Sequence, residues 1–346
     1  MTKEQRDNNF SRIIKWVGYL TAIFSLCATV IGVAKYLHNR EETGKKVATL
    51  LTTEAAEQKA GDYSAGWQTL EKAVQLDPDS GRVRTAQEEL AIQWLEDVHL
   101  QESQKFSDVT GKVEPILLRA VASSKPGSRQ ADLRAHVGWA YFLESRDGTP
   151  NLDPTRAYRE AVAEDPNNPY AQAMWGHWLL WHNCEQIPEA KVHFAAALAP
   201  QREGDYVRRL ELSALLNCHT RQSDLEVIRV ANEMREEGRR PDDWARGHIL
   251  DIYSGEFAPR TAETLEFVSA LPPAEHVATF RWLFDDLNSD DNSRGARTYY
   301  LAEIQEAGGQ RQEALANYTL ALRQMSQYST LKEAADAGVK RLSGPH

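Results

Sequence analysis

Residues 61–78, which read GDYSAGWQTLEKAVQLDP, decide the fold. A Gly-Asp-Tyr turn comes first, Gly66, Leu70 and Ala73 then follow at helical spacing, and Pro78 closes the run. Small residues let two helices approach closely, and a proline stops a helix because it lacks the amide hydrogen. The stretch therefore predicts the turn and the second helix of a helical hairpin.

Similar combinations of small residues, aromatic residues and a closing proline recur along the chain. They are Gly138, Tyr141, Tyr158, Ala161 and Pro166; Gly176, Ala190, Phe194, Ala197 and Pro200; and Ala302, Gly309, Ala314, Tyr318 and Ala321, the last set without a proline. This pattern resembles the tetratricopeptide repeat family, whose unit is a helix-turn-helix of about 34 residues. The resemblance implies an all-α solenoid of helical hairpins over residues 47–328.

The remaining stretches keep helical periodicity but lose the consensus residues. They are 82–122, 205–237, 242–270 and 274–287, and we interpret them as degenerate repeats. Residues 329–342 are amphipathic and are expected to form a helix that caps the last repeat. No segment alternates with period two, so no strands are expected.

A membrane-spanning helix is predicted near the N-terminus. From Trp16 to Ala34 there are 19 residues without a charge. As a helix this run is roughly 28 Å long, close to the ~30 Å hydrocarbon core of a bilayer. The prediction is a short tail at 1–11, a transmembrane helix at 12–37 and a charged juxtamembrane linker at 38–46.

Other interpretations of the apolar run fit less well. A cleaved signal peptide has an apolar stretch of only about 7 to 15 residues, and Gly32-Val33-Ala34 is a poor cleavage site. A lipoprotein is disfavoured because Cys27 follows the bulky Leu26. Basic residues are equally numerous on both sides of the run, so charge does not decide the orientation. A short tail before a single signal-anchor helix favours export of the large domain.

The charge distribution bears on the partner. The chain has a net charge of −10, but residues 1–46 carry eight basic and four acidic residues, which leaves +4 there and −14 in the remainder. A region this acidic is repelled by phosphate backbones, which argues against nucleic acid as the partner. Other proteins are the expected partners.

The common motifs of catalysis and metal binding are absent or incomplete in this sequence. The sequence has no GxSxG elbow, phosphate-binding glycine loop, dinucleotide fingerprint or HExxH helix. The segment Asp286-x-Asn288-x-Asp290 resembles the start of a calcium loop, but Asp291 and Arg297 stand where that loop needs Gly and Glu. We therefore expect this segment to be an acidic interhelical loop that binds no metal. Because the catalytic motifs are absent, we also expect no cofactor, no small-molecule substrate and no enzymatic activity.

The cysteines Cys27, Cys184 and Cys218 are too few for a disulfide scaffold. A metal site at His177, His182 and Cys184 is disfavoured, because side chains five apart on a helix do not share a face. Cys184 and Cys218 are 34 residues apart, and equivalent positions in stacked repeats are neighbours. The pair is either a disulfide, which requires an oxidising compartment, or two buried free thiols.

Aromatic residues are the candidates for partner binding. Such solenoids present a concave surface lined mainly by first helices. Residues 170–182 carry Trp175, Trp178 and Trp181, and the preceding unit carries Trp139 and Tyr141. These side chains either form solenoid core or include an exposed anchor for a peptide or helix.

The resemblance extends to N-terminally anchored tetratricopeptide proteins of bacterial inner membranes. It implies a protein-binding scaffold or chaperone-like adaptor in envelope complex assembly, with the soluble domain in the periplasm or, alternatively, facing the cytoplasm. The competing hypothesis is a structural subunit of a membrane complex. It would pack through small residues of the span, namely Gly18, Ala22, Ser25, Thr29 and Gly32.

Overall fold

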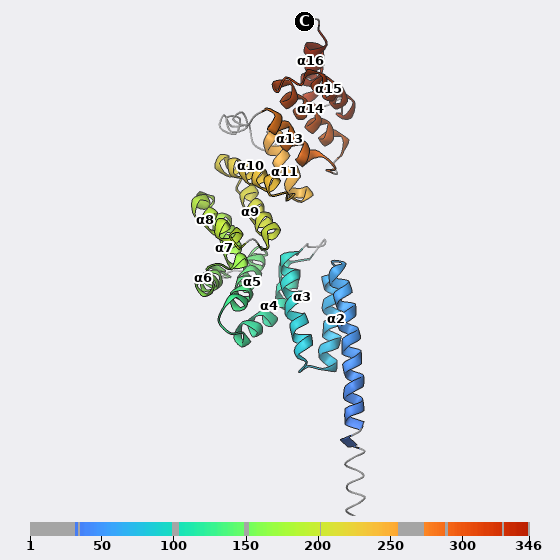
Figure 1. Ribbon diagram of the computed structural model, residues 1–346, viewed down its shortest axis with the longest axis vertical. Coiled ribbons are helices and arrows are strands. Elements are labelled where there is room, and N and C mark those ends of the chain that lie inside the picture. The colour runs from blue at the N-terminus through green and yellow to red at the C-terminus, as the bar shows by residue number, and fades with distance from the viewer. Residues whose placement is uncertain are drawn as a thin grey trace, which may run out of the picture. The chain divides into compact units, whose positions relative to one another are not determined.

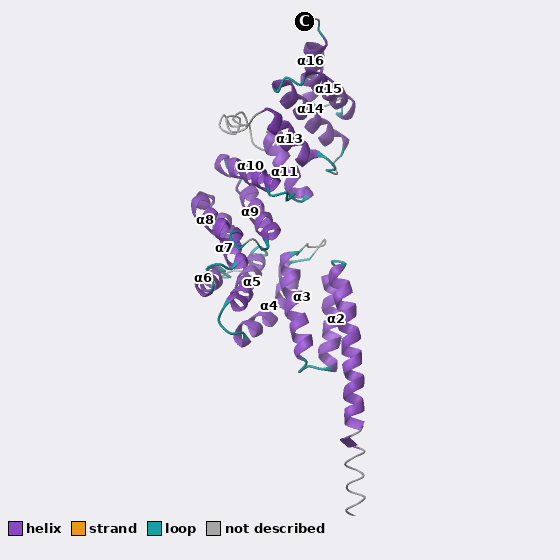
Figure 2. Cartoon of the chain, in the orientation of Figure 1, coloured by secondary structure: helices purple, strands orange, loops and turns teal. Residues whose placement is uncertain are grey.

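The computed structural model describes residues 32–33, 35–98, 104–148, 152–200, 202–254, 273–287, 290–326 and 329–344. Over these ranges the regular structure is helical and no strand occurs, as Figure 2 shows. The all-α prediction is confirmed for the described chain. Contacts divide the chain into unit 1, Met1–Gln104 with Gly111–Leu117, and unit 2, Lys105–Thr110 with Leu118–His346.

Unit 1 contains the predicted hairpin. A helix over residues 35–59 is followed by a turn and by α2 (Tyr63–Leu76), and α3 (Gly81–Glu96) comes next (Figure 1). Gly61 has a φ of 77°, a conformation that favours glycine, and the Asp62 side chain caps α2 by accepting a bond from the amide of Ala65 at 3.0 Å. Val47, Ala73 and Val83 form a small core between the three helices. The turn and second helix lie where the sequence predicts them.

Residues 38–46, predicted as a charged juxtamembrane linker, are helical and belong to the helix 35–59. Their charges pair along one face: Lys45 lies 2.7 Å from Glu41 and His38 lies 3.7 Å from Glu42, both at i,i+4 spacing. Such pairs support an exposed helix by about 0.2 to 0.5 kcal/mol each. The run contains no proline, and Gly44 alone does not end the helix.

Unit 2 continues the series of helices. α4 (Phe106–Ser123) has residues in both units. It is followed by α5 (Ser128–Ser145), α6 (Thr155–Glu164), α7 (Pro169–His182), the 3-10 turn η1 (Cys184–Gln186), α8 (Ile187–Leu198), α9 (Gly204–Cys218), α10 (Arg221–Glu236), α11 (Asp243–Ser254), α13 (Pro273–Phe284), α14 (Asp291–Ala307), α15 (Arg311–Gln324) and α16 (Leu331–Ser343).

Small residues act as the hairpin prediction requires. A Cβ atom on Gly138 in α5 would lie 2.6 Å from the ring of Tyr158 in α6, and one on Gly176 in α7 would lie 3.2 Å from the ring of Phe194 in α8. The missing side chains therefore make room for the fully buried aromatics of the second helices. α16 packs in the same way, because a Cβ atom on its Gly338 would lie too close to the ring of Tyr318 in α15.

The repeat period is visible in contacts between equivalent positions. α5, α7 and α9 contact one another in succession. Polar contacts between residues 35 positions apart join corresponding positions of helices two elements apart, namely Gln58 with Gln93, Lys191 with Glu226, and Glu306 with Arg341. Contacts between residues 34 positions apart join the start of one helix to the end of the next, namely Tyr63 with Asp97, Thr110 with Glu144, and Asp205 with Arg239. Stacked hairpins of one repeat length produce this spacing.

The degenerate stretches are helical where they are described. α3 and α4 occupy 82–122, α9 and α10 occupy 205–237, and α11 and α13 fall in the last two stretches. α16 forms the predicted C-terminal helix at Leu331–Ser343, with Ala335, Gly338 and Leu342 facing inward.

The predicted transmembrane helix at 12–37 lies outside the described residues except for 32–33 and 35–37. Across the described ranges, no helix combines the length and the apolar character needed to cross a bilayer.

Candidate protein-binding surface

Trp139 belongs to the core of unit 2. Its side chain on α5 is 7 % exposed, and its ring lies 4.9 Å from that of Phe142 and 5.0 Å from that of His177. The hypothesis that Trp139 contributes to an exposed anchor is therefore wrong. The sandwiching of α5 between neighbouring helices explains this, because such a helix is apolar on most sides.

Trp175 and Trp178 are half-buried and brace α7 against its neighbours. The Trp175 ring stacks on His193 of α8, with centroids 5.2 Å apart and planes inclined by 13°. The Trp178 indole nitrogen donates a hydrogen bond of 3.0 Å to the hydroxyl of Thr155 at the start of α6. Trp175 thus contacts α8 through its ring and Trp178 contacts α6 through its indole N–H, so these residues hold three helices together.

Trp181 takes part in a cation–π arrangement. The Arg146 guanidinium lies 5.1 Å from the Trp181 ring centroid and 4.8 Å from that of Phe106. Burial lowers the pKa of Arg146, but a guanidinium remains charged in proteins. The half-buried Trp181 ring also meets Phe142 edge-on at 5.2 Å, so it is held rigidly.

His177 is buried among the rings of this aromatic core, whereas His182 is exposed. Burial, followed by the nearby charge of Arg146, lowers the pKa of His177 to about 3, so its ring is neutral at ordinary pH. The histidines do not converge, and no group of metal ligands occurs among the residues that the structure describes.

Tyr141 differs from the four tryptophans because it lines an open pocket of about 350 Å³. The pocket lies between α4, α5 and α6. Five lining residues form an apolar wall: Leu118, Val121, Val137, Tyr141 and Ala157. Four lining residues are charged: Arg134, Asp153, Arg156 and Glu160. Leu118 is 44 % exposed, which is high for a leucine.

Three charged residues of this pocket, Arg134, Arg156 and Glu160, form ion pairs within the chain, and the fourth, Asp153, accepts a hydrogen bond from the amide of Thr155. Arg134 lies 2.7 Å from Glu160 and 3.0 Å from Glu164, and Arg156 lies 2.8 Å from Glu160. The hydrogen bond from Arg156 lowers the pKa of Glu160, so this carboxylate is ionised. A partner's apolar side chain can therefore enter against the apolar wall without separating unpaired charges.

Cys184 and Cys218 form a disulfide with a Cα–Cα distance of 5.7 Å. Asn183 caps α7 at its C-terminal end, Cys184 begins η1, and Cys218 is the last residue of α9. The bond thus joins equivalent ends of two first helices, one repeat apart. Both cysteines are partly exposed, and Cys184 lines an open pocket of about 480 Å³.

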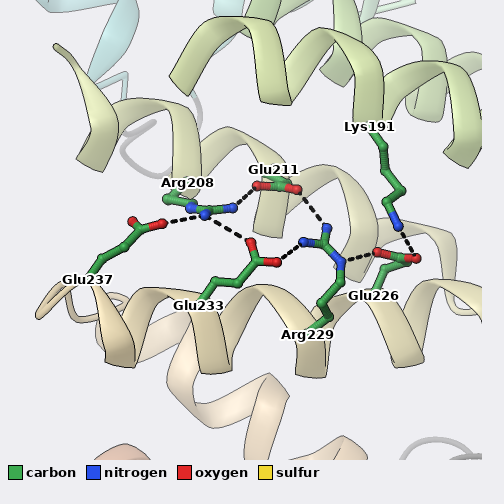
Figure 3. Close-up of polar contacts among 7 residues, drawn as sticks. All are labelled: Lys191, Arg208, Glu211, Glu226, Arg229, Glu233 and Glu237. Carbon is green, nitrogen blue, oxygen red and sulfur yellow. Dashed lines mark hydrogen bonds and ion pairs between the residues drawn. The ribbon is translucent and has the colours of Figure 1, made fainter. Parts of the chain in front are cut away.

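A chain of charged residues links α8, α9 and α10, as Figure 3 shows. Arg208 and Glu211 of α9 have side chains only 5 % and 3 % exposed and lie 2.7 Å apart. The other pairs are Lys191 with Glu226 at 2.7 Å, Arg229 with Glu226 and Glu233 at 2.5 Å and with Glu211 at 3.2 Å, and Arg208 with Glu233 at 2.9 Å and Glu237 at 2.5 Å.

This network has the features of a structural ion-pair cluster. Burial raises the pKa of Glu211 even though Arg208 and Arg229 act to lower it, whereas the hydrogen bond from Arg208 lowers the pKa of Glu237. The network was not predicted from the sequence. Its local signal was present in the i,i+3 and i,i+4 spacing of Glu226, Arg229 and Glu233.

The calcium-like segment joins α13 to α14. Arg240 donates hydrogen bonds to the carbonyl oxygen of Trp282, at 3.1 Å, and to that of Asp285. Arg246 donates to the carbonyl oxygen of Leu283, at 2.8 Å, and also to that of Asp285. Two guanidinium groups therefore occupy the C-terminal end of α13, where cations are favoured. Asp290 accepts a bond from the amide of Ser293 and caps α14. Asn288 lies outside the described residues.

Comparison with known proteins finds similarity among solved structures. The sequence matches no family model and no curated protein. Among solved structures, the chain is similar to a tetratricopeptide repeat protein from Parabacteroides merdae, with 13 % sequence identity and a TM-score of 0.39; the match covers 87 % of this chain and all of that one.

Proposed function

We propose that this chain is a membrane-anchored scaffold or chaperone-like adaptor that binds other proteins through the surface of its helical repeats. The observation that carries the proposal is the series of contacts between equivalent helix positions 34 or 35 residues apart, including the disulfide, which marks a stack of hairpins. Stacked hairpins give an extended surface rather than a deep catalytic cleft, and such surfaces serve protein binding. We propose that the repeat surface binds its partner proteins reversibly and without forming a covalent bond.

The pocket between α4, α5 and α6 is the proposed contact point. It combines an exposed Leu118, the ring of Tyr141 and a rim of internally paired charges. A partially buried aromatic beside an apolar wall is the kind of site where interfaces concentrate binding energy. The partner we propose presents an apolar side chain from a peptide or helix.

The proposed location is a bacterial inner membrane, with the repeats in the periplasm and a role in envelope complex assembly. Two observations support it: the apolar run from Trp16 to Ala34 and the disulfide between Cys184 and Cys218. Disulfides persist in oxidising compartments and are rare in the cytosol. Tethering would raise the effective concentration of the repeats for partners near the membrane.

Site-specific crosslinking tests the binding proposal. A photoreactive phenylalanine analogue replaces Tyr141 or Leu118 in the full chain in living cells, and Arg311, an exposed residue of α15, serves as the matched control position. Discrete crosslinked proteins from 141 and 118 but not from 311 are expected. Irradiation that yields no adduct at either pocket position, with the variants present at normal levels, would refute this contact point.

The second candidate function is a structural subunit that packs through its transmembrane helix. The small residues from Gly18 to Gly32 favour it, since they allow close helix approach in a bilayer. Two truncated chains separate the candidates, one lacking residues 47–346 and one with residues 1–37 replaced by an unrelated anchor. A complex that survives loss of the repeats supports the subunit; one that survives replacement of the anchor supports the scaffold.

Orientation has its own test. Intact cells are treated with membrane-permeant or impermeant maleimide, with and without prior reduction. Labelling of Cys184 and Cys218 by the impermeant reagent, after the outer barrier is opened and only after reduction, is the expected result. Labelling by the permeant reagent alone, without reduction, would place the repeats in the cytoplasm and contradict the proposed location.

A further inference from the structure

Two buried glutamates stand where the best-matched repeats have glycine. Gly138 and Gly176 each lie on a first helix and face the second helix of the same hairpin. Glu211, 35 residues after Gly176, likewise faces α10 of its own hairpin, where it meets Arg229. Glu54 in the helix 35–59 faces α2, since a Cβ on Gly66 would lie 3.8 Å from the Cγ of Glu54.

The two glutamates are equally buried but lie in opposite electrostatic surroundings. Glu211 is 2 % exposed and is bound by Arg208 and Arg229. Glu54 is 4 % exposed, and the charges that act on it belong to two other carboxylates, Glu89 and Glu57. A buried carboxylate costs several kcal/mol when ionised without a partner, so the two positions respond differently to pH.

The groups around Glu54 come from three helices. Its own helix contributes Glu57, whose Oε2 is buried without a hydrogen-bond partner, and Gln58. α3 contributes Glu89, together with Gln93, which accepts a bond of 2.7 Å from Gln58. α2 contributes Gly66, which has no side chain. Within the described residues, no basic group acts on the Glu54 carboxyl.

This arrangement sets the protonation state of Glu54. Burial, and then the charges of Glu89 and Glu57, raise its pKa from 4.5 to about 7. The unfolded chain loses the Glu54 proton near pH 4.5, whereas the folded hairpin keeps it until about pH 7. The folded state therefore binds more protons between these values, and the stability of the hairpin falls as pH rises through that window.

We propose that the hairpin formed by the helix 35–59 and α2 is a proton-sensitive element of the repeat array. With a neutral Glu54 the helix 35–59 packs closely over Gly66 and Leu90, and with an ionised Glu54 the same packing is weakened. The element follows directly after the predicted membrane segment. Protonation of one carboxyl group thereby controls how firmly the first hairpin is held.

Hydrogen exchange of the full chain in detergent tests the proposal. Amide protection in residues 47–76 is measured at several pH values and corrected for the intrinsic pH dependence of exchange. Protection is expected to fall about tenfold per pH unit between about pH 5 and pH 7 and then to level off, because one proton is linked to opening. A profile that stays flat over this range would overturn the proposal.

Variants assign the effect to Glu54. Glu54→Gln removes the titrating group and is expected to abolish the slope, whereas Asp79→Asn, which neutralises an exposed carboxylate of the same unit, should keep it. Glu89→Gln removes one neighbouring charge and should move the levelling point to lower pH. If Glu54→Gln fails to fold, Glu89→Gln still decides, because an unchanged profile in that variant overturns the proposal.

Discussion

Removal of the Cys184–Cys218 disulfide is expected to destabilise the segment that it closes. The bond joins residues 34 positions apart, and the loop between them contains η1, α8 and α9. Two perturbations remove it: reduction, and the double substitution Cys184→Ala with Cys218→Ala. Both are made in a Cys27→Ser background, so that no other thiol is present.

The magnitude follows from the loop length. In the chain-entropy treatment, a crosslink over 34 residues stabilises the folded state by about 4 kcal/mol at room temperature. Since about 1.4 kcal/mol corresponds to a factor of ten, the equilibrium for opening this segment should shift on the order of a thousandfold. The ends of α7 and α9 lose their covalent link, so the effect belongs to α8 and α9.

Hydrogen exchange read out by mass spectrometry is the assay, because a repeat array can open locally without unfolding as a whole. Amides of α8 and α9 should lose protection in both the reduced and the substituted chain, and amides of α15, outside the loop, should not. Thiol titration proves that reduction is complete. Unchanged exchange in α8 and α9 after complete reduction would refute the reasoning, because it would show that the disulfide does not restrict the open state of this segment.

Three further outcomes are expected. Gly138→Val should lower stability by about 1 to 3 kcal/mol in thermal unfolding, because its Cβ would meet an aromatic ring at 2.6 Å. Gly111→Ala, a helical glycine of α4 with open space around it, should instead raise stability by about 0.5 to 1 kcal/mol. Arg208→Met should lower the free energy of unfolding by about 3 to 5 kcal/mol, because it leaves buried carboxylates without a partner. Lys191→Met, which removes a more exposed ion pair, should lower it by under about 1 kcal/mol. Acidification should destabilise α9 and α10, because the Arg208 bond lowers the pKa of Glu237, and this contribution, present above the ordinary carboxyl pKa, is lost as the pH falls through the lowered value. The loss should be smaller in Glu237→Gln, in which Glu226 still contributes.

The hairpins were predictable because their signals are local. Gly61 and Asp62 form the turn and the cap within a few residues of each other, and Gly138 and Gly176 leave space for aromatics of the next helix. Charged runs were harder to interpret. Residues 38–46 carry the composition of a linker, but they contain no proline and the helix 35–59 runs through them, with an i,i+4 ion pair between Lys45 and Glu41.

The candidate site was less predictable, because burial depends on helices that are distant in the sequence. Trp139 and Tyr141 are two residues apart on α5, yet one is core and the other lines a pocket formed with α4 and α6. The ion-pair network shows the same limit. The spacing of its residues along α10 is visible in the sequence, but their pairing with Arg208 and Glu211 of α9 is a property of the packed hairpin.

The network on α9 and α10 also bears on how the chain reaches its native arrangement. In a protein with several similar hairpins, a glycine facing an aromatic ring fits many second helices nearly as well as its own, and misassembly between repeats is a common failure. Arg208 and Glu211 do not have this freedom, since pairing α9 with any helix that lacks the acidic and basic residues of α10 would bury charges without partners. The charged pair therefore favours packing of α9 on α10 over packing of α9 on a helix that lacks these residues.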